Sequence, residues 1–585
     1  MTLHPPASPA EVDTTPPAAG VTRPSEETDD PSLPRASVPP AGHDADDLDP
    51  ARTLCAPDAL AARLGPAWPH LVRLLGPIEE AHTLEGVCAA ALAAMLPDGL
   101  ERPRSRQALL RAAGPERGLV NLFLDALGPR ERALLFDGAL PPRALAAAYA
   151  RRAAHRAASG VDHAALEAAE RARVDVIVVG AGLAGLTAAQ DLEQAGLRVL
   201  VLEASARVGG RAEVETVDGT PIDLGAAWIH DAPQNPLTEL ARRLGLTLRT
   251  DAGPRWVFGG PGTPQAEGRR LQAAYDALSE AWLRAGRRYD VPAARVPVPA
   301  AARTEGAAAL CAPLSMGVEP EQVSTRDYAT IFDEGHALMV EEGLGTLVEA
   351  MAHGLTVLTE HPVQRVVWRG ADGVTVHAGH RRFSARAVLL TVPPRAVSAG
   401  KLSFDPPLPE AKRAAAEALP MGRLEKVLVT FEPDALPASW PAFLRLHHAS
   451  APDVELLVRP FGRPWVVGFV GGDAARAANP DERARRVKAV LARILGPEIM
   501  DRAGTVHATR WGETPWIHGA YSVARPGHHA ARAAWGAPVA GRLFFAGEAA
   551  HGRWAQCLPG AFLTGRSAAQ DIVETLVPRR PAAVG

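Results

Sequence analysis

The sequence has few lysines, few cysteines and no long apolar run, and each shortage limits what the protein can be. Its only lysines are Lys401, Lys412, Lys426 and Lys488, although 62 residues are basic. A lysine inside a motif therefore carries more information here than usual. The four cysteines are widely spaced and show no metal-binding spacing, so we expect free thiols in a reducing compartment and no metal site.

No segment is apolar over the length that a bilayer requires. The longest apolar stretch, 87–96, is too short to span a membrane, and the N-terminus lacks the basic and apolar parts of a secretory signal. The net charge of −4 offers no general attraction to a polyanion. We therefore expect a cytoplasmic protein with neither a membrane nor a nucleic acid as partner.

The chain divides by composition into two ends and a long central part. Residues 1–50 are rich in Pro, Asp and Glu with almost no large apolar residues, so we expect disorder there and in the short tail 578–585. Residues 55–170 show helical runs separated by Gly-Pro and Pro-Pro breaks, which predict a helical N-terminal domain. A structural or dimerisation role for this domain is favoured over recognition, and a homodimer is left open.

A dinucleotide-binding pattern begins at residue 174. An apolar run over 174–179 predicts a buried strand, and Gly180, Gly182 and Gly185 follow it in G-x-G-x-x-G spacing before an Ala/Leu-rich helix. A second apolar run ends at Glu203, about 20 residues on, where a carboxylate can bind the adenosine ribose. The order of strand, glycines, helix, strand and acid predicts a Rossmann-like α/β domain that binds a dinucleotide.

Two further motifs narrow the ligand. Val208-Gly209-Gly210-Arg211 follows directly, and Asp223-Leu224-Gly225-Ala226-Ala227-Trp228-Ile229-His230 comes soon after. Together they resemble the flavin-containing amine oxidase family, which includes monoamine oxidases, polyamine oxidases and histone-lysine demethylases. The resemblance implies an α/β fold, with a Rossmann-like FAD-binding domain (GR2-type) interleaved with an α+β substrate domain. The FAD-binding parts would be 172–255, 341–400 and 509–577, and the substrate parts 256–340 and 401–508.

The resemblance also implies a set of FAD contacts. Besides the first glycines and Glu203, the residues at matching positions are Arg207, Gly210, Arg211, Gly225, Ala226, Ala227, Trp228, Val363, Gly547, Glu548, Gly560 and Ala561. The final helix, which opens at 559–561, would direct its N-terminal dipole at the flavin. Monoamine oxidases carry their flavin-linking cysteine immediately before the tyrosine that Tyr521 matches, and this chain has Ala520 there. We therefore expect noncovalent FAD.

Lys426 stands where the family carries a lysine that holds a water near flavin N5. It lies in an apolar, strand-like run, where burial would lower its pKa. A solvent-facing lysine on an edge strand is the alternative.

Trp511 and Tyr521, ten residues apart, match a flavin-edge tryptophan and one wall of the family's aromatic cage. Cys557 stands where monoamine oxidases place the opposite tyrosine, so the cage is half-built, and Trp516 and Trp554 are candidates to complete it. His230 either tunes recognition or simply packs beside Trp228.

The reaction that the resemblance implies is amine oxidation, with hydride transfer from the amine α-carbon to flavin N5 and reduction of O2 to H2O2. Relatives that oxidise amino acids place an arginine shortly after the Asp-Leu-Gly motif, whereas this chain has Trp228-Ile229-His230. That favours an amine without an α-carboxylate, although an arginine could reach in from elsewhere. An L-amino-acid oxidase, a flavin desaturase and a non-catalytic FAD-binding interaction protein remain alternatives.

Overall fold

The computed structural model describes residues 173–577, apart from 261, 332–335 and 371–372, together with two short strands nearer the N-terminus. These strands, β1 (Leu54–Cys55) and β2 (His82–Thr83), pair antiparallel. Strand β2 lies between two of the helical runs that the sequence shows within 55–170. The other predictions for 1–50, 55–170 and 578–585 fall outside the described residues.

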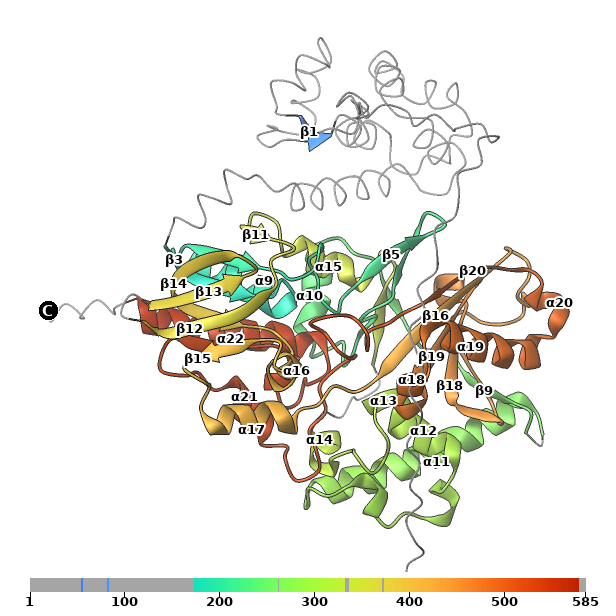
Figure 1. Ribbon diagram of the computed structural model, residues 1–585. Helices are drawn as coiled ribbons and strands as arrows, with labels where there is room; N and C mark the ends of the chain where they lie inside the picture. Colours follow the sequence, from blue (N-terminus) through green and yellow to red (C-terminus); the bar gives the residue numbers. More distant parts are fainter. Residues whose placement is uncertain are drawn as a thin grey trace, which may run out of the picture. The chain divides into compact units, whose positions relative to one another are not determined.

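The described residues form a mixed α/β fold whose larger sheet has eight strands (Figure 1). Its order is β11-β4-β3-β14-β13-β12-β15, and β21 also pairs with β14. The bounds are β3 Val174–Val179, β4 Val199–Leu202, β11 Val357–Leu358, β12 Val363–Gly370, β13 Gly373–Ala378, β14 Arg381–Leu390, β15 Ser403–Asp405 and β21 Leu543–Phe545. Because β15 pairs with β12, it belongs to this sheet although it lies past the expected boundary at residue 400.

Both faces of the larger sheet are covered, as its continuous apolar strands require. One face packs against α9 (Leu183–Gln194) and α22 (Leu558–Leu576), which also contact each other. The other face packs against α17 (Glu410–Ala418) and α21 (Ala531–Gly536). The parallel strands β4, β3, β14 and β21 end at the same edge, where ligands bind in open α/β sheets.

A second sheet of six strands has the order β20-β16-β19-β18-β17-β9 (Figure 1). Its strands are β9 Arg255–Phe258, β16 Leu424–Phe431, β17 Leu444–His448, β18 Ala451–Val458, β19 Trp465–Gly471 and β20 Ala503–Ala508. All neighbours pair antiparallel except β17 and β9. Helix α19 (Pro480–Leu495) covers one face, and the other face packs on residues around Leu224 and Ala227.

A helical layer packs around α11 (Pro264–Gly286), which contacts α12 (Glu305–Cys311) and α14 (Thr325–Thr330). The remaining strands are β5 Val214–Val217, β6 Thr220–Asp223, β7 Trp228–Ile229, β8 Leu248–Thr250 and β10 Leu338–Val340. The remaining helices are α10 Pro236–Arg243, α13 Pro313–Met316, α15 Leu344–Ala350, α16 Pro394–Ser398, α18 Gly472–Ala477 and α20 Pro497–Met500. Within the described ranges, none of the helices has the length and apolar character needed to cross a membrane.

Candidate active site

A cavity of about 1080 Å³ opens at the carboxyl ends of the parallel strands and extends along the second sheet. Its wall contains residues from the first glycine loop, from the middle of the chain and from the C-terminal part. The predicted site residues that line it are Gly180, Gly182, Glu203, Arg207, Gly210, Arg211, Gly225, Ala226, Ala227, Trp228, His230, Val363, Lys426, Trp511, Tyr521, Gly547, Glu548, Cys557 and Ala561. Two predicted residues, Gly185 and Gly560, stand behind this wall.

The glycine loop is built for close approach of a ligand to the backbone. Gly180 has φ +110°, a conformation that L side chains rarely adopt, and it turns the chain from β3 into α9. Gly182 is the N-cap of α9, with no side chain satisfying the first N–H groups of the helix. A β-carbon on Gly182 would meet no protein atom within 4 Å. Unpaired N–H groups at a helix start, beside open cavity, are what a pyrophosphate needs.

Gly185 acts through packing instead of contact with the cavity. A β-carbon there would lie 2.0 Å from the Gly180 carbonyl oxygen. The third glycine therefore lets α9 pack tightly behind the loop. Gly560 was predicted as a cofactor contact, but it is not among the residues that line the cavity. A β-carbon on Gly560 would lie 2.0 Å from the Trp554 carbonyl oxygen, so a glycine is needed there to let the two backbone segments approach.

Glu203, at the end of β4, is held in place for a ribose. One carboxylate oxygen accepts the backbone N–H of Ala181 at 2.7 Å, and the other accepts the N–H and hydroxyl of Ser205 at 2.9 and 2.8 Å. The carboxylate is buried but lines the cavity. Together with the uncapped start of α9, this arrangement fits the adenosine diphosphate part of FAD.

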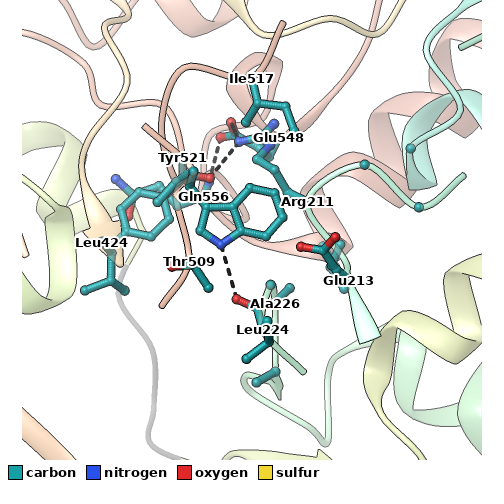
Figure 2. Close-up of a pocket in the computed structure, with 18 of the residues that line it drawn as sticks. Arg211, Glu213, Leu224, Ala226, Leu424, Thr509, Ile517, Tyr521, Glu548 and Gln556 are labelled. Carbon is teal, nitrogen blue, oxygen red and sulfur yellow. Dashed lines mark hydrogen bonds and ion pairs between the residues drawn. The ribbon is translucent and has the colours of Figure 1, made fainter. Parts of the chain in front are cut away.

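An ion pair between Arg211 and Glu548 joins two segments of the cavity wall that are far apart in the sequence. Arg211 donates to Glu548 at 2.8 Å and to the Ala520 carbonyl at 3.1 Å (Figure 2). Glu548 also accepts the N–H of Ser522 at 3.1 Å and that of Gln556 at 2.9 Å. Burial opposes the charge of Glu548, but Arg211 and Arg532 outweigh it and lower its pKa. Glu548 is therefore a fixed anion that joins three segments of the cavity wall.

A buried pair stands behind this junction. Arg532 donates twice to Asp327 at 2.6 Å and once to the Ser522 hydroxyl at 2.8 Å, which in turn donates to Glu548 at 2.7 Å. Burial would raise the pKa of Asp327, but Arg532 holds it well below its usual range. Asp327 and Arg532 thus position the Ser522–Glu548 contact.

Lys426 is buried on β16, not exposed on an edge strand. Its Nζ donates to the carbonyl oxygens of Asp223 at 3.0 Å and Gly225 at 2.7 Å, and lies 5.4 Å from the Trp228 ring. Burial lowers the pKa of Lys426 to about 8, against the opposing charge of Asp223. Because an ammonium has three donors, one remains for a water or ligand in the cavity.

Trp511 owes its place to Glu425, which sequence reasoning missed. The Glu425 carboxylate, 1% exposed, accepts the N–H of Trp511 at 2.9 Å, the N–H of Gly512 at 2.8 Å and the Thr509 hydroxyl at 2.7 Å. The Trp511 indole then donates to the Leu224 carbonyl at 3.2 Å. A carboxylate inside the apolar strand before Lys426 was the available signal.

Tyr521 forms part of the cavity wall (Figure 2). Its hydroxyl donates to the Ser315 carbonyl at 2.8 Å. Burial and the nearby Cys557 thiol raise its pKa. Of the two tryptophans expected to complete the cage, Trp516 lines the cavity and Trp554 is not among its lining residues. His230 lies 6.4 Å from the Trp228 ring, centroid to centroid, and also lines the cavity, so it packs beside Trp228 and faces the same space.

The far part of the cavity contains charged residues that the motifs did not indicate. They are Asp251, Arg255, Arg445 and Glu455. No short spacing in the sequence connects them, because they come from strands and a loop that meet only in the fold. The described part of the chain contains no group of three or more His, Cys, Asp and Glu side chains that could hold a metal ion.

The flavin containing amine oxidoreductase family matches this chain over residues 183–305 and 307–573. The chain belongs to this family. The resemblance that the motifs carried is thereby confirmed, and a flavin-containing family implies FAD. The matched segments contain Glu203, Lys426, Tyr521 and Glu548, and so most of the cavity wall.

Curated relatives include plant demethylase homologues and polyamine oxidases. The chain is 29% identical over 460 residues to Lysine-specific histone demethylase 1 homolog 1 of Arabidopsis thaliana, covering 70% of this chain and 53% of the relative. It is 28% identical over 451 residues to Polyamine oxidase 2 of the same plant, covering 68% of this chain and 87% of the relative. The chain therefore spans about half the length of the demethylase homologue.

Two solved structures are similar over almost their whole length. Putrescine oxidase, wild type bound to putrescine, aligns with TM-score 0.59 and 26% identity, covering 69% of this chain and 99% of that chain. Cyclohexylamine oxidase from Brevibacterium oxydans IH-35A aligns with TM-score 0.58 and 26% identity, covering 69% and 100%. The mixed α/β fold described above is thus one that amine oxidases share.

Proposed function

We propose that the protein is an FAD-dependent amine oxidase acting on CH–NH or CH–NH2 groups. One observation carries this proposal: a single cavity contains the dinucleotide loop at one end and Lys426, Trp511 and Tyr521 at the other. The names of putrescine oxidase and cyclohexylamine oxidase, both similar in fold, support an amine substrate.

When bound, FAD would accept a hydride from the amine α-carbon and pass the electrons to O2, so that amine, O2 and water yield aldehyde, H2O2 and ammonia or a shorter amine. The first turn of α9 and Glu203 would bind the adenosine diphosphate. The start of α22, where Cys557 and Ala561 line the cavity, would direct its dipole at the flavin ring.

The amine would lie against Tyr521, whose hydroxyl is held by Ser315 and whose ring is therefore fixed in orientation. A fixed aromatic face attracts a cationic amine and orients its α-carbon. Lys426 would hold a water at the reacting edge, since it lines this cavity and its ammonium has a third donor. Because residue 520 is alanine, the flavin would be held without a covalent bond.

The test is a reconstitution followed by an activity screen. Full-length protein would be loaded with FAD, and peroxide release and anaerobic bleaching of the flavin would be measured with monoamines, diamines, polyamines and L-amino acids. We expect bleaching and peroxide with an amine, and free FAD after acid precipitation. Flavin-loaded protein that no amine bleaches would contradict the proposal and favour a binding role, whereas a carbon–carbon double bond in the product would indicate a desaturase.

A further inference from the structure

The second sheet forms a continuous wall that leads from Lys426 to Arg255. Lys426 on β16 pairs with Phe469 on β19, and Phe469 pairs with Glu455 on β18. Arg445 on the next strand, β17, pairs with Arg255 on the edge strand β9. Strands lie about 4.8 Å apart, so β16 and β9 are about 19 Å apart across the sheet. One substrate must be extended to contact both ends of this wall.

The far end of the wall carries four charged residues, Asp251, Arg255, Arg445 and Glu455, which we call the distal charge cluster. The Asp251 carboxylate accepts hydrogen bonds from both terminal nitrogens of Arg445, at 2.9 and 2.6 Å, and from the Trp228 indole N–H at 2.6 Å. Glu455 accepts from Arg255 at 3.2 Å and lies 3.6 Å from the Arg445 Nε. The cluster therefore balances two arginines against two carboxylates.

Neither carboxylate of the cluster is left for a ligand cation. The Asp251 side chain is 1% exposed and already accepts three donors. Burial would raise the pKa of Glu455, but Arg255 and His447 hold it well below its usual range, with the His447 ring at 2.9 Å. A diamine would bring a second ammonium to this end of the cavity. Both carboxylates there already pair with basic side chains, so neither is available to bind that ammonium.

Arg255, in contrast, has a donor without an acceptor. Its terminal nitrogens donate to Gln272 at 2.9 Å and to Glu455, but its buried Nε has no partner among the described residues. A buried donor left unpaired destabilises the protein, and more so when it is charged. The Arg255 side chain lines the cavity and is 17% exposed, and its guanidinium has five N–H donors, two of which donate to Gln272 and Glu455, so it can also bind a ligand acceptor. A guanidinium matches the geometry of a planar carboxylate and can bind it through two parallel N–H groups.

We propose that Arg255 is a specificity-determining residue that binds a carboxylate at the end of the substrate remote from the amine. The substrate class is then an extended amino carboxylate, and free diamines are disfavoured. This inference rests on the proposed amine oxidase function. It agrees with Trp228-Ile229-His230 after the Asp-Leu-Gly motif, where relatives that oxidise amino acids carry an arginine for the α-carboxylate.

The activity test compares three series of substrates matched in chain length: ω-amino carboxylates, alkylamines and diamines. In wild-type holoenzyme we expect kcat/KM to be highest for one length of amino carboxylate and lowest for the diamines. Arg255→Gln should lower kcat/KM for the amino carboxylate roughly 10- to 100-fold through KM, leaving the alkylamine within about twofold. Arg249→Gln is the matched control, because Arg249 is an exposed arginine on β8 that pairs with Glu341 outside the cavity. Diamines as the preferred series, or an equal loss for all three series in Arg255→Gln, would overturn the inference.

A binding measurement separates this inference from the proposed function. Straight-chain alkanoates of increasing length would be titrated calorimetrically into full-length wild type, Arg255→Gln and Arg255→Lys, which keeps the charge but loses the fork. We expect the alkanoate to bind wild type at least about tenfold more tightly than either variant. Equal affinity for all three proteins would overturn the carboxylate site, even if amines are oxidised. Binding that depends on Arg255, with no amine oxidised, would retain the site and overturn the amine oxidase function instead.

Discussion

The Nζ of Lys426 lies 2.7 Å from the carbonyl oxygen of Gly225, so a lysine of the second sheet is tied to the chain segment that follows β6. The same nitrogen contacts the Asp223 carbonyl at 3.0 Å. Gly225 and Lys426 are 201 residues apart in the chain, so these contacts join the second sheet to the segment after β6 beside the cavity. The lysine is therefore both a structural link and a donor inside the site.

Replacing Lys426 with methionine should slow turnover while FAD stays bound. The variant keeps an apolar side chain of similar length but loses the donor in the cavity, and proton-handling groups in active sites contribute roughly 10²- to 10⁴-fold. We expect a loss of at least about 10-fold in flavin reduction or reoxidation, measured separately by stopped flow. Lys488→Met on the exposed side of α19 is the matched control. Wild-type rates in both half-reactions of Lys426→Met would remove Lys426 from the reaction.

The lowered pKa of Lys426 also predicts a pH dependence of stability. Its pKa is about 8 in the folded protein and 10.5 in an ordinary setting. Between these values the unfolded chain binds more protons than the folded protein, so this group makes the free energy of unfolding rise with pH. Below pH 8 its destabilising effect is fully present.

The measurement is urea unfolding of FAD-free wild type and Lys426→Met from about pH 7 to about pH 10. We expect the difference in unfolding free energy to shift in favour of wild type as the pH rises. Parallel curves for the two proteins would show that the buried lysine does not titrate in this range.

The glycine loop was accessible from the sequence because its geometry is local. The strand, Gly180, Gly182 and the helix start follow one another within a few residues, so spacing alone places them together. Glu203 is fixed by the next strand of the same unit. The residues that the sequence did not reveal act in pairs across long separations: Arg255 and Glu455 are 200 residues apart, and their pairing is set by how β9 joins the second sheet. No local periodicity carries that information.

The aromatic cage was also predicted only in part from the sequence. Tyr521 and Cys557 could be placed by motif spacing, and both line the cavity. Trp554 is close to Cys557 in sequence but packs outside the lining, whereas Trp516 reaches the cavity from a loop where its φ is +71°. Which tryptophan faces the site depends on loop conformation, which the residue types around it did not indicate.

Two glycine variants should separate ligand binding from packing. Gly182→Ala places a methyl group in open cavity with no protein atom within 4 Å, so the FAD-free protein should keep its stability. The same methyl group would occupy the space that the pyrophosphate needs, and we expect FAD affinity to fall at least about tenfold. Gly185→Ala should instead cost about 1–3 kcal/mol of stability, because its methyl group meets the Gly180 carbonyl.

The measurements are FAD titration by flavin fluorescence and urea unfolding of the FAD-free proteins. A Gly182→Ala protein that binds FAD like wild type would place the pyrophosphate elsewhere. Equal stability of Gly185→Ala and wild type would show that α9 can move away from the loop without cost.

The buried Asp327–Arg532 pair predicts a non-additive pair of variants. Arg532→Met leaves the Asp327 carboxylate, which is 0% exposed, without its main counter-charge, and breaking a buried pair in this way costs about 3–5 kcal/mol. The double variant Asp327→Asn/Arg532→Met removes both charges, so it should be more stable than Arg532→Met alone. Both variants should weaken FAD binding, because the donor that holds Ser522 against Glu548 is lost. Urea unfolding and FAD titration of the two proteins check this prediction. If the double variant is no more stable than Arg532→Met, then His529 and the Ala524 N–H, which also contact the Asp327 carboxylate, compensate its charge without Arg532.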